Sequence, residues 1–175
     1  MAAAEITLVL GGARSGKSAY AETLAAESAE RLVYIATAEA ADAEMADRIA
    51  DHRARRGPEW TTVEEPLELA AAIARADDPD TVILVDCLTL WLGNLMAAER
   101  DVAAEIGRLV ECLDEVDAKV VLVASEVGLG IVPDNALARA FRDLHGTLNQ
   151  VIAAAADRVV FVAAGLPMIL KGAPG

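Results

Sequence analysis

Five short runs of β-branched and aliphatic residues recur along the 175-residue chain and restrict its fold more than any other feature. They occupy residues 6–10, 31–37, 81–86, 119–125 and 158–164. Their apolar character is continuous rather than alternating, which is typical of parallel strands covered on both faces. Segments with helical spacing accompany them at 17–29, 41–55, 66–76, 101–116 and 134–156. The alternation predicts a single α/β domain over residues 1–175, with a mainly parallel sheet flanked by helices.

A glycine-rich stretch, GGARSGKS, follows the first predicted strand and fits the pattern G-x-x-x-x-G-K-[ST] of a phosphate-binding loop (P-loop). It comprises Gly11, Gly12, Ala13, Arg14, Ser15, Gly16, Lys17 and Ser18. Its backbone N–H groups are expected to surround phosphates, with Lys17 as the catalytic cation and Ser18 as a ligand of Mg²⁺. Asp86, which ends the third apolar run, is the expected second residue at Mg²⁺. The structural alternatives are an ordinary glycine turn and a helix-capping carboxylate.

The charge balance narrows the class of nucleotide-binding protein. A formal net charge of -13 argues against nucleic acid or an anionic membrane as a partner, because both need extended basic surfaces. The N-K-x-D string by which GTPase switches read their base does not occur in the sequence. A small-molecule kinase or nucleotidyltransferase is the class that remains.

Compartment signals favour the cytoplasm. Two cysteines, Cys87 and Cys112, do not make a disulfide framework or a four-ligand zinc site. The N-terminal residues lack a basic region before their apolar run, so no signal peptide is expected. No apolar run reaches the ~20 residues that a membrane-spanning helix needs.

Residues 47–60, DRIADHRARRGPEW, place one of the two histidines in a strongly basic segment. At about 100° per residue, Arg48, Arg55 and Arg56 share a helical face with His52, while Arg53 lies to the side. One interpretation is a buried structural histidine with arginines that pair with nearby carboxylates. A second is a nucleophilic neutral imidazole beside guanidiniums that neutralise a phosphate. A third is an arginine-bearing lid over an ordinary kinase site.

The motifs of this chain resemble, over nearly its whole length, the bifunctional adenosylcobinamide kinase/adenosylcobinamide-phosphate guanylyltransferase family of cobalamin biosynthesis. The resemblance rests on GGARSGKS, YIATAEA, EMADRIADHRARRGPEWTTVEEP, VDCLTLWLGNL, SEVGLGIVPDN, ARAFRDLHGTLNQ and AAGLPMILK. It implies an enzyme that phosphorylates adenosylcobinamide with a nucleoside triphosphate and then transfers GMP from GTP to the new phosphate. The products would be adenosylcobinamide-GDP and pyrophosphate, with the GMP carried on a histidine that corresponds to His52.

The same resemblance implies a RecA-like P-loop NTPase fold, a corrinoid substrate, GTP, ATP and Mg²⁺ as cofactors, and a homo-oligomer, specifically a trimer. It implies nucleotide contacts by the P-loop residues above, by Ile35, Ala36 and Thr37, by Arg53, Ala54, Arg55 and Arg56, and by Glu64 and Asp86. The chain departs from the family pattern N-E-V-G at Ser125, so the contacts of an asparagine are not assigned there. A single-function kinase with an arginine lid and a GTP-binding regulatory module stay open as alternatives.

Overall fold

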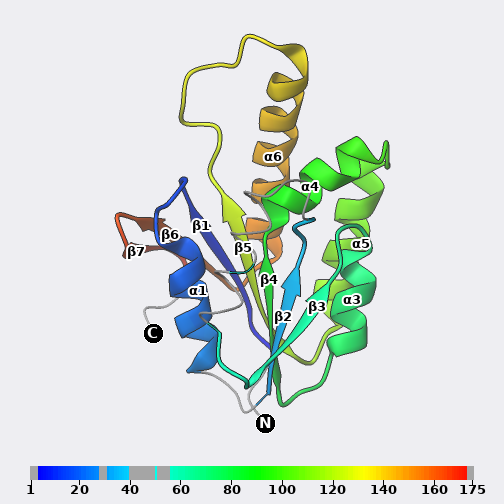
Figure 1. The fold of residues 1–175 in the computed structure, drawn as a ribbon, viewed down its shortest axis with the longest axis vertical. Coiled ribbons are helices and arrows are strands. Elements are labelled where there is room, and N and C mark those ends of the chain that lie inside the picture. Colours follow the sequence, from blue (N-terminus) through cyan, green and yellow to red (C-terminus); the bar gives the residue numbers. More distant parts are fainter. Residues whose placement is uncertain (1–3, 28–30, 40–49, 51–55, 173–175) are drawn as a thin grey trace.

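The computed structural model describes residues 4–27, 31–39, 50 and 56–172. Within these residues seven strands form one sheet in the order β3-β2-β4-β5-β1-β6-β7 (Figure 1). The strands are β1 (Ile6–Gly11), β2 (Arg31–Ala36), β3 (Trp60–Glu64), β4 (Thr81–Asp86), β5 (Lys119–Ser125), β6 (Arg158–Ala163) and β7 (Leu166–Lys171). All neighbouring pairs are parallel except β6 and β7. The predicted α/β fold with a mainly parallel sheet is confirmed.

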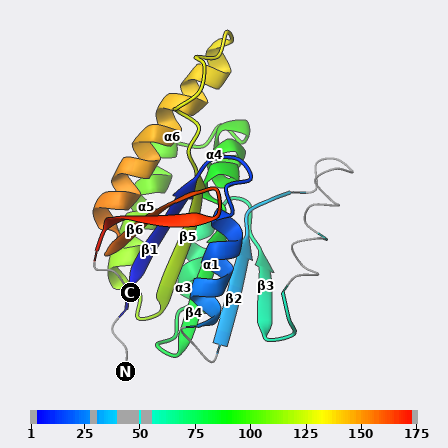
Figure 2. The same ribbon diagram turned by 90° about the vertical axis from the view of Figure 1, so that its left-hand side faces the viewer.

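Helices cover both faces of this sheet, as the continuous apolar strands predict (Figures 1 and 2). They are α1 (Lys17–Ala26), α3 (Leu69–Ala76), α4 (Leu88–Ala97), α5 (Val102–Glu115) and α6 (Ala136–Ala155). Alternate residues of β4 enter the two cores, since Leu84 packs with α1 on one face while Ile83 packs with the other four helices. The predicted helix over 41–55 lies outside the described residues, apart from Ala50, which is helical.

The five predicted strands are confirmed to within a residue at their ends, but β3, β7 and α4 are not among the sequence predictions. Both missed strands are edge strands, and every residue of β7 is exposed. Strand β7 also contains Pro167, which argues against a strand unless the strand lies at an edge. Helix α4 begins two residues after Asp86, so only Asp86 and Cys87 separate its apolar residues from those of the buried strand.

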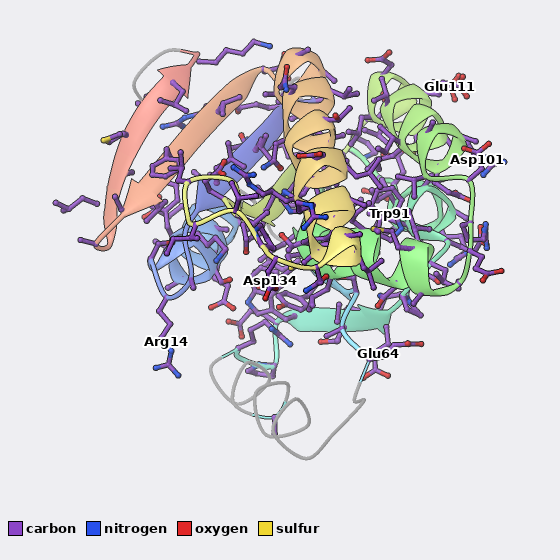
Figure 3. All side chains as sticks on the ribbon, turned by 90° about the horizontal axis from the view of Figure 1, so that it is seen from above. Arg14, Glu64, Trp91, Asp101, Glu111 and Asp134 are labelled. Carbon is purple, nitrogen blue, oxygen red and sulfur yellow. The ribbon has the colours of Figure 1, made fainter. Side chains whose placement is uncertain are left out.

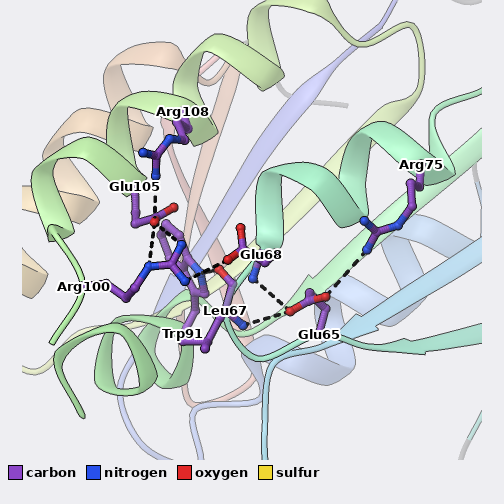
Figure 4. Close-up of polar contacts among 8 residues, drawn as sticks. All are labelled: Glu65, Leu67, Glu68, Arg75, Trp91, Arg100, Glu105 and Arg108. Atoms are coloured by element: carbon purple, nitrogen blue, oxygen red, sulfur yellow. Dashed lines mark hydrogen bonds and ion pairs between the residues drawn. The ribbon is translucent and has the colours of Figure 1, made fainter. Parts of the chain in front are cut away.

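A polar cluster fastens the connection between β3 and α3 to the neighbouring helices (Figure 4). Arg100 donates to Glu68 at 2.8 Å and to Glu105, which is 5% exposed. Arg108 contacts the same Glu105 oxygen at 2.7 Å, and the Trp91 indole N–H donates to the Leu67 carbonyl at 2.9 Å. Because paired charges and hydrogen bonds offset the cost of burial, the cluster fixes the exit of β3 relative to α4 and α5. No helix in the described part of the chain is long and apolar enough to cross a membrane.

Candidate functional site

Four residues predicted to bind a nucleotide, each from a different strand, lie at the carboxyl edge of the sheet: Gly11, Ala36, Glu64 and Asp86. The strand register places them at one level, since Gly11 pairs with Ser125, and Ala36 pairs with both Glu64 and Asp86. In an open parallel sheet this edge is where ligands bind. Figure 3 looks onto it, with Arg14 and Glu64 on either side of the loop that carries Asp134.

The P-loop has a backbone shape that only glycine permits at two positions. A Cβ on Gly11 would lie 2.4 Å from the Ser15 Oγ and 2.7 Å from the Val162 carbonyl oxygen. Gly16 has φ +91°, and a Cβ there would lie 3.2 Å from the Gly165 Cα. The turn between β6 and β7 supports the loop from behind, because the Gly165 N–H donates to the Ser15 carbonyl at 2.8 Å. The β6–β7 hairpin therefore holds the P-loop in place.

The P-loop presents groups suited to phosphates and to a magnesium ion. Lys17 and Ser18 open helix α1, whose first backbone N–H groups have no partner within the helix and favour an anion. The Lys17 ammonium lies over the loop and donates to the Gly12 carbonyl at 3.1 Å. Arg14 and Ala13 are exposed, whereas Ser15 is buried and its Oγ has no hydrogen-bond partner among the described residues.

Asp86 lies at the end of β4, and β5 separates its strand from the P-loop strand. Two strand spacings separate the β4 and β1 backbones by about 10 Å, and the Asp86 side chain, Mg²⁺ and its water ligands can together span such a separation. Among the described residues the Tyr34 hydroxyl is the one donor to this carboxylate, at 3.1 Å, and it binds Oδ2. In the described ranges no group of three or more His, Cys, Asp or Glu side chains is placed so that it could hold a metal ion. Ser18 and Asp86 thus fit a Mg²⁺ ion held mainly by phosphate oxygens and water.

The end of β2 is tied to β4 by Thr37, which is fully buried. Its hydroxyl donates to the Cys87 carbonyl at 2.7 Å and accepts from the Cys87 N–H at 2.9 Å, while Asn94 donates to its carbonyl at 2.8 Å. The Ile35 side chain is buried in the core that faces α3 to α6. Nucleotide contacts by Thr37 and Ile35 stay predictions, and these side chains hold the strand ends together.

Arg56 is the one residue of the basic segment's H-R-x-x-R motif that the structure describes; His52, Arg53, Ala54 and Arg55 lie outside the described residues. Its guanidinium carbon lies 3.4 Å from the centre of the Tyr34 ring, and its Nη1 lies 3.9 Å from a Glu22 oxygen. The side chain is only 4% exposed. Arg56 therefore lies on the same sheet face as α1 and the helix-forming end of the P-loop.

The loop after β5 is held beside the P-loop through main-chain contacts. The Glu126 N–H donates to the Gly11 carbonyl at 2.8 Å. The Ser125 N–H donates to the Thr89 Oγ1 at 2.8 Å, and this oxygen lies 2.9 Å from Nε2 of the buried His145. Burial lowers the pKa of His145, and the charge of Glu126 opposes that shift. The second histidine is therefore a structural, neutral imidazole.

Cys87 follows Asp86 and is a packing residue. It is 8% exposed, and burial, followed by the charge of Asp86, raises the pKa of its thiol to about 11. At neutral pH the thiol is protonated and is a poor nucleophile.

Tyr34, Glu22 and Asn94 are site residues that sequence reasoning missed. The signal for Tyr34 is its position, two residues before the end of a strand whose other buried side chains are aliphatic. A side chain there shares a face with the strand's last residue and can reach the end of the neighbouring strand. Asn94 carries no such signal, because its role depends on the direction of α4.

Solved structures with low sequence identity show the same fold. The RadB recombinase superposes with a TM-score of 0.55 at 15% identity, covering 91% of this chain and 74% of its own. A protein of Pyrococcus horikoshii OT3 superposes with a TM-score of 0.58 at 9% identity, covering 99% of this chain and 89% of its own. The predicted RecA-like P-loop NTPase fold is confirmed.

Sequence relatives are much closer. The bifunctional adenosylcobalamin biosynthesis protein CobP of Pseudomonas aeruginosa is 52% identical over 169 residues, which are 95% of this chain and 98% of the relative. The corresponding protein CobU of Escherichia coli is 42% identical over 179 aligned positions, covering 94% of this chain and 98% of the relative. A family model described as cobinamide kinase/cobinamide phosphate guanyltransferase matches residues 7–170. The chain therefore belongs to the cobinamide kinase/cobinamide phosphate guanyltransferase family.

Proposed function

We propose that this enzyme carries out both reactions at one nucleotide site, first as a kinase for adenosylcobinamide and then as a guanylyltransferase through a histidine intermediate. One observation carries the proposal: Arg56, from the basic segment, packs on Tyr34, whose hydroxyl binds Asp86. Arg56 and Asp86, the carboxylate proposed to bind the metal, are thus linked through Tyr34 on the sheet face that α1 covers.

In the kinase reaction, the P-loop N–H groups and Lys17 bind the phosphates of the donor, which is ATP or GTP. The hydroxyl oxygen of the corrinoid's aminopropanol arm attacks the γ-phosphorus, the bond to the β–γ bridging oxygen breaks, and the hydroxyl proton passes to solvent. Lys17 stabilises the charge that develops on the phosphoryl oxygens. Ser18 and Asp86 would hold a Mg²⁺ ion, which neutralises charge on the β- and γ-oxygens when bound.

In the guanylyl transfer, a ring nitrogen of His52 attacks the α-phosphorus of GTP and pyrophosphate leaves. A phosphate oxygen of adenosylcobinamide-phosphate then attacks the same phosphorus, which releases the imidazole and forms the diphosphate of adenosylcobinamide-GDP. Arg53, Arg55 and Arg56 would neutralise the phosphate, and nearby positive charge keeps the imidazole neutral and nucleophilic. Ala54, Ile35, Ala36, Thr37 and Glu64 complete the proposed nucleotide contacts.

Incubation with GTP labelled at the α-phosphate tests the histidine step. The wild-type enzyme is expected to form a covalent GMP adduct that is stable in base and labile in acid, and His52→Asn abolishes it. The chain has two histidines, so His145→Gln is a matched control that keeps the adduct. An adduct that persists in His52→Asn, or that is absent from wild type, would refute the mechanism and favour an arginine-lid kinase or a regulatory GTP-binding module.

Turnover of adenosylcobinamide compared with adenosylcobinamide-phosphate tests the kinase step separately. A bifunctional enzyme converts both to adenosylcobinamide-GDP, and Lys17→Ala is expected to suppress the conversion of the first. Running the reaction with ATP plus a limiting amount of GTP identifies the phosphoryl donor. If the enzyme did not consume adenosylcobinamide, the kinase reaction would be refuted and only the proposed guanylyltransferase activity would stand.

We also propose that the enzyme is a cytoplasmic homotrimer. In support, the edge strand β7 exposes a row of large apolar side chains: Leu166 (69%), Met168 (52%), Ile169 (39%) and Leu170 (59%). Such an edge is unfavourable in water unless another surface covers it. Light scattering is expected to give three times the 18.3 kDa chain mass, and Met168→Glu shifts it toward the monomer. Cell fractionation tests the compartment.

A further inference from the structure

Tyr34 occupies an unusual position between the two charged groups that the proposed chemistry uses. It lies in β2 opposite Leu84 of β4. Two residues later, Ala36 pairs with Asp86, so Tyr34 and Ala36 share one face of the strand. The Tyr34 side chain is 4% exposed and is long enough to reach diagonally across the sheet from β2 to the end of β4. There its hydroxyl donates to the Asp86 Oδ2 at 3.1 Å.

The ring of the same tyrosine binds Arg56. The guanidinium lies 3.4 Å from the ring centre, within the range of a cation–π contact, and Trp60 packs edge-on against the ring with centroids 6.1 Å apart. Arg56 Nε and Nη1 are buried with no hydrogen-bond partner among the described residues. Burying a guanidinium with unpaired donors is costly, and the contacts with the Tyr34 ring and Glu22 offset only part of that cost. The remaining N–H groups can donate to an anion with several oxygens.

The Tyr34 hydroxyl donates to one carboxylate oxygen of Asp86, Oδ2, at 3.1 Å. The described residues provide no second donor to this carboxylate, so its other oxygen, Oδ1, can accept from a water molecule of a hydrated metal ion.

We propose that Tyr34 is a positioning residue that orients Asp86 with its hydroxyl and Arg56 with its ring, so that the metal side and the phosphate side of the nucleotide site are fixed by one side chain. The inference rests on the proposed function, since it assigns Asp86 to the metal and Arg56 to the phosphate. It assigns two roles to one residue, and substitutions can remove the hydroxyl alone or the hydroxyl together with the ring.

Tyr34→Phe removes the hydroxyl and keeps the ring, whereas Tyr34→Leu removes both. Trp60→Phe is the matched control, because it alters the packing against the ring and leaves the hydroxyl and the guanidinium contact in place. The first readout is binding of Mn²⁺, as a spin-active substitute for Mg²⁺, by electron paramagnetic resonance in the presence of a non-hydrolysable GTP analogue. The second is the rate of GMP-adduct formation at saturating metal. Thermal unfolding verifies that each variant is folded.

Tyr34→Phe is expected to raise the Kd for Mn²⁺ about tenfold, the effect of losing one hydrogen bond to a charged group, with the adduct rate at saturating metal nearly unchanged. Tyr34→Leu is expected to raise the Kd similarly and also to slow adduct formation at least tenfold. Trp60→Phe changes neither value by more than about twofold. Adding Tyr34→Phe to Asp86→Asn has no further effect on Mn²⁺ binding, because the partner of the hydroxyl is already altered.

An unchanged Mn²⁺ affinity in Tyr34→Phe, or an equal loss in Trp60→Phe, would overturn the positioning role. A rise that persists on the Asp86→Asn background would overturn it as well, since the effect would not pass through Asp86. The metal titration requires no turnover, so it separates this inference from the proposed function. If wild type forms no adduct but Tyr34→Phe still weakens Mn²⁺ binding, the histidine mechanism fails and the link between Tyr34 and Asp86 stands.

Discussion

Thr37→Val is expected to destabilise the enzyme strongly while keeping its shape. Valine has nearly the size of threonine, so the substitution removes a buried hydroxyl without creating a cavity. The hydroxyl makes two hydrogen bonds, donating to the Cys87 carbonyl and accepting from the Cys87 N–H. Both bonds join the end of β2 to the residue that follows β4.

Losing the two bonds has different energetic costs, because one partner group keeps another hydrogen bond in the variant and the other does not. The Cys87 carbonyl also accepts from the Trp91 N–H at 3.2 Å, so it keeps a partner in the variant. The Cys87 N–H loses its acceptor in a position where Thr37 is fully buried and Cys87 is 8% exposed. An orphaned buried donor costs about 1–3 kcal/mol, and the lost bond to the carbonyl adds about 1 kcal/mol. The free energy of unfolding should therefore fall by about 2–4 kcal/mol.

Urea unfolding followed by circular dichroism measures this difference, at one protein concentration so that subunit assembly does not contribute. For a chain of this size the same loss lowers Tm by roughly 5–15 °C. Thr37→Ser is the control, because it keeps the hydroxyl and loses one methyl group, about 0.8 kcal/mol. The reasoning would be refuted if the free energy of unfolding of Thr37→Val lay within about 0.5 kcal/mol of the wild-type value. It would also be refuted if Thr37→Val were no more destabilised than Thr37→Ser.

Three further predictions concern the loop, a helix end and a buried carboxylate. Gly16→Ala should weaken GTP binding about five- to thirtyfold, because a φ of +91° costs about 1–2 kcal/mol for any other residue. Gly107→Ala, with open space around it, should leave the Kd for GTP unchanged. Lys171→Met should lower the free energy of unfolding by about 1–2 kcal/mol, since its ammonium binds three carbonyls at the end of α6, and Lys171→Arg should recover part of the loss. Burial alone would raise the pKa of Glu105, but the charges and hydrogen bonds of two arginines outweigh it and hold that pKa below the ordinary value. Its contribution to stability is therefore complete above about pH 4.3 and is lost as pH falls through the lowered pKa, so Tm in acid should depend less on pH in Glu105→Gln than in wild type.

The fold could be predicted because the central residues of its buried strands are continuously apolar. A strand covered on both faces cannot alternate, so runs such as 81–86 and 119–125 distinguish a parallel sheet from other classes. The edge strands could not be predicted in this way. Residues 60–64 and 166–171 are largely exposed, and their pairing depends on where the rest of the sheet ends.

The candidate site could also be predicted only in part, where a local sequence pattern determines it. The P-loop could be predicted because its local shape requires glycines at fixed spacing: Gly11 lies too close to Ser15 and Val162 for a side chain, and Gly16 has a positive φ. The role proposed for Asp86 rests on its place at the end of a strand, and it stays a prediction. The Tyr34 contacts could not be predicted, because they join residues far apart in the sequence through the strand register. The prediction for His52 is untested by the structure and depends on the adduct experiment.

The serine at position 125 shows how a departure from the family pattern can leave the framework of the site intact. The structure holds this position through its main chain: the N–H donates to Thr89, and the carbonyl accepts from Asn149 at 3.4 Å. Neither contact depends on the identity of the side chain, so exchange between serine and asparagine does not alter the support of the neighbouring P-loop. Any difference that Ser125 makes must therefore arise on the ligand side, where the shorter side chain leaves more room at the carboxyl edge. Such a difference would affect affinity for a substrate rather than the stability of the fold.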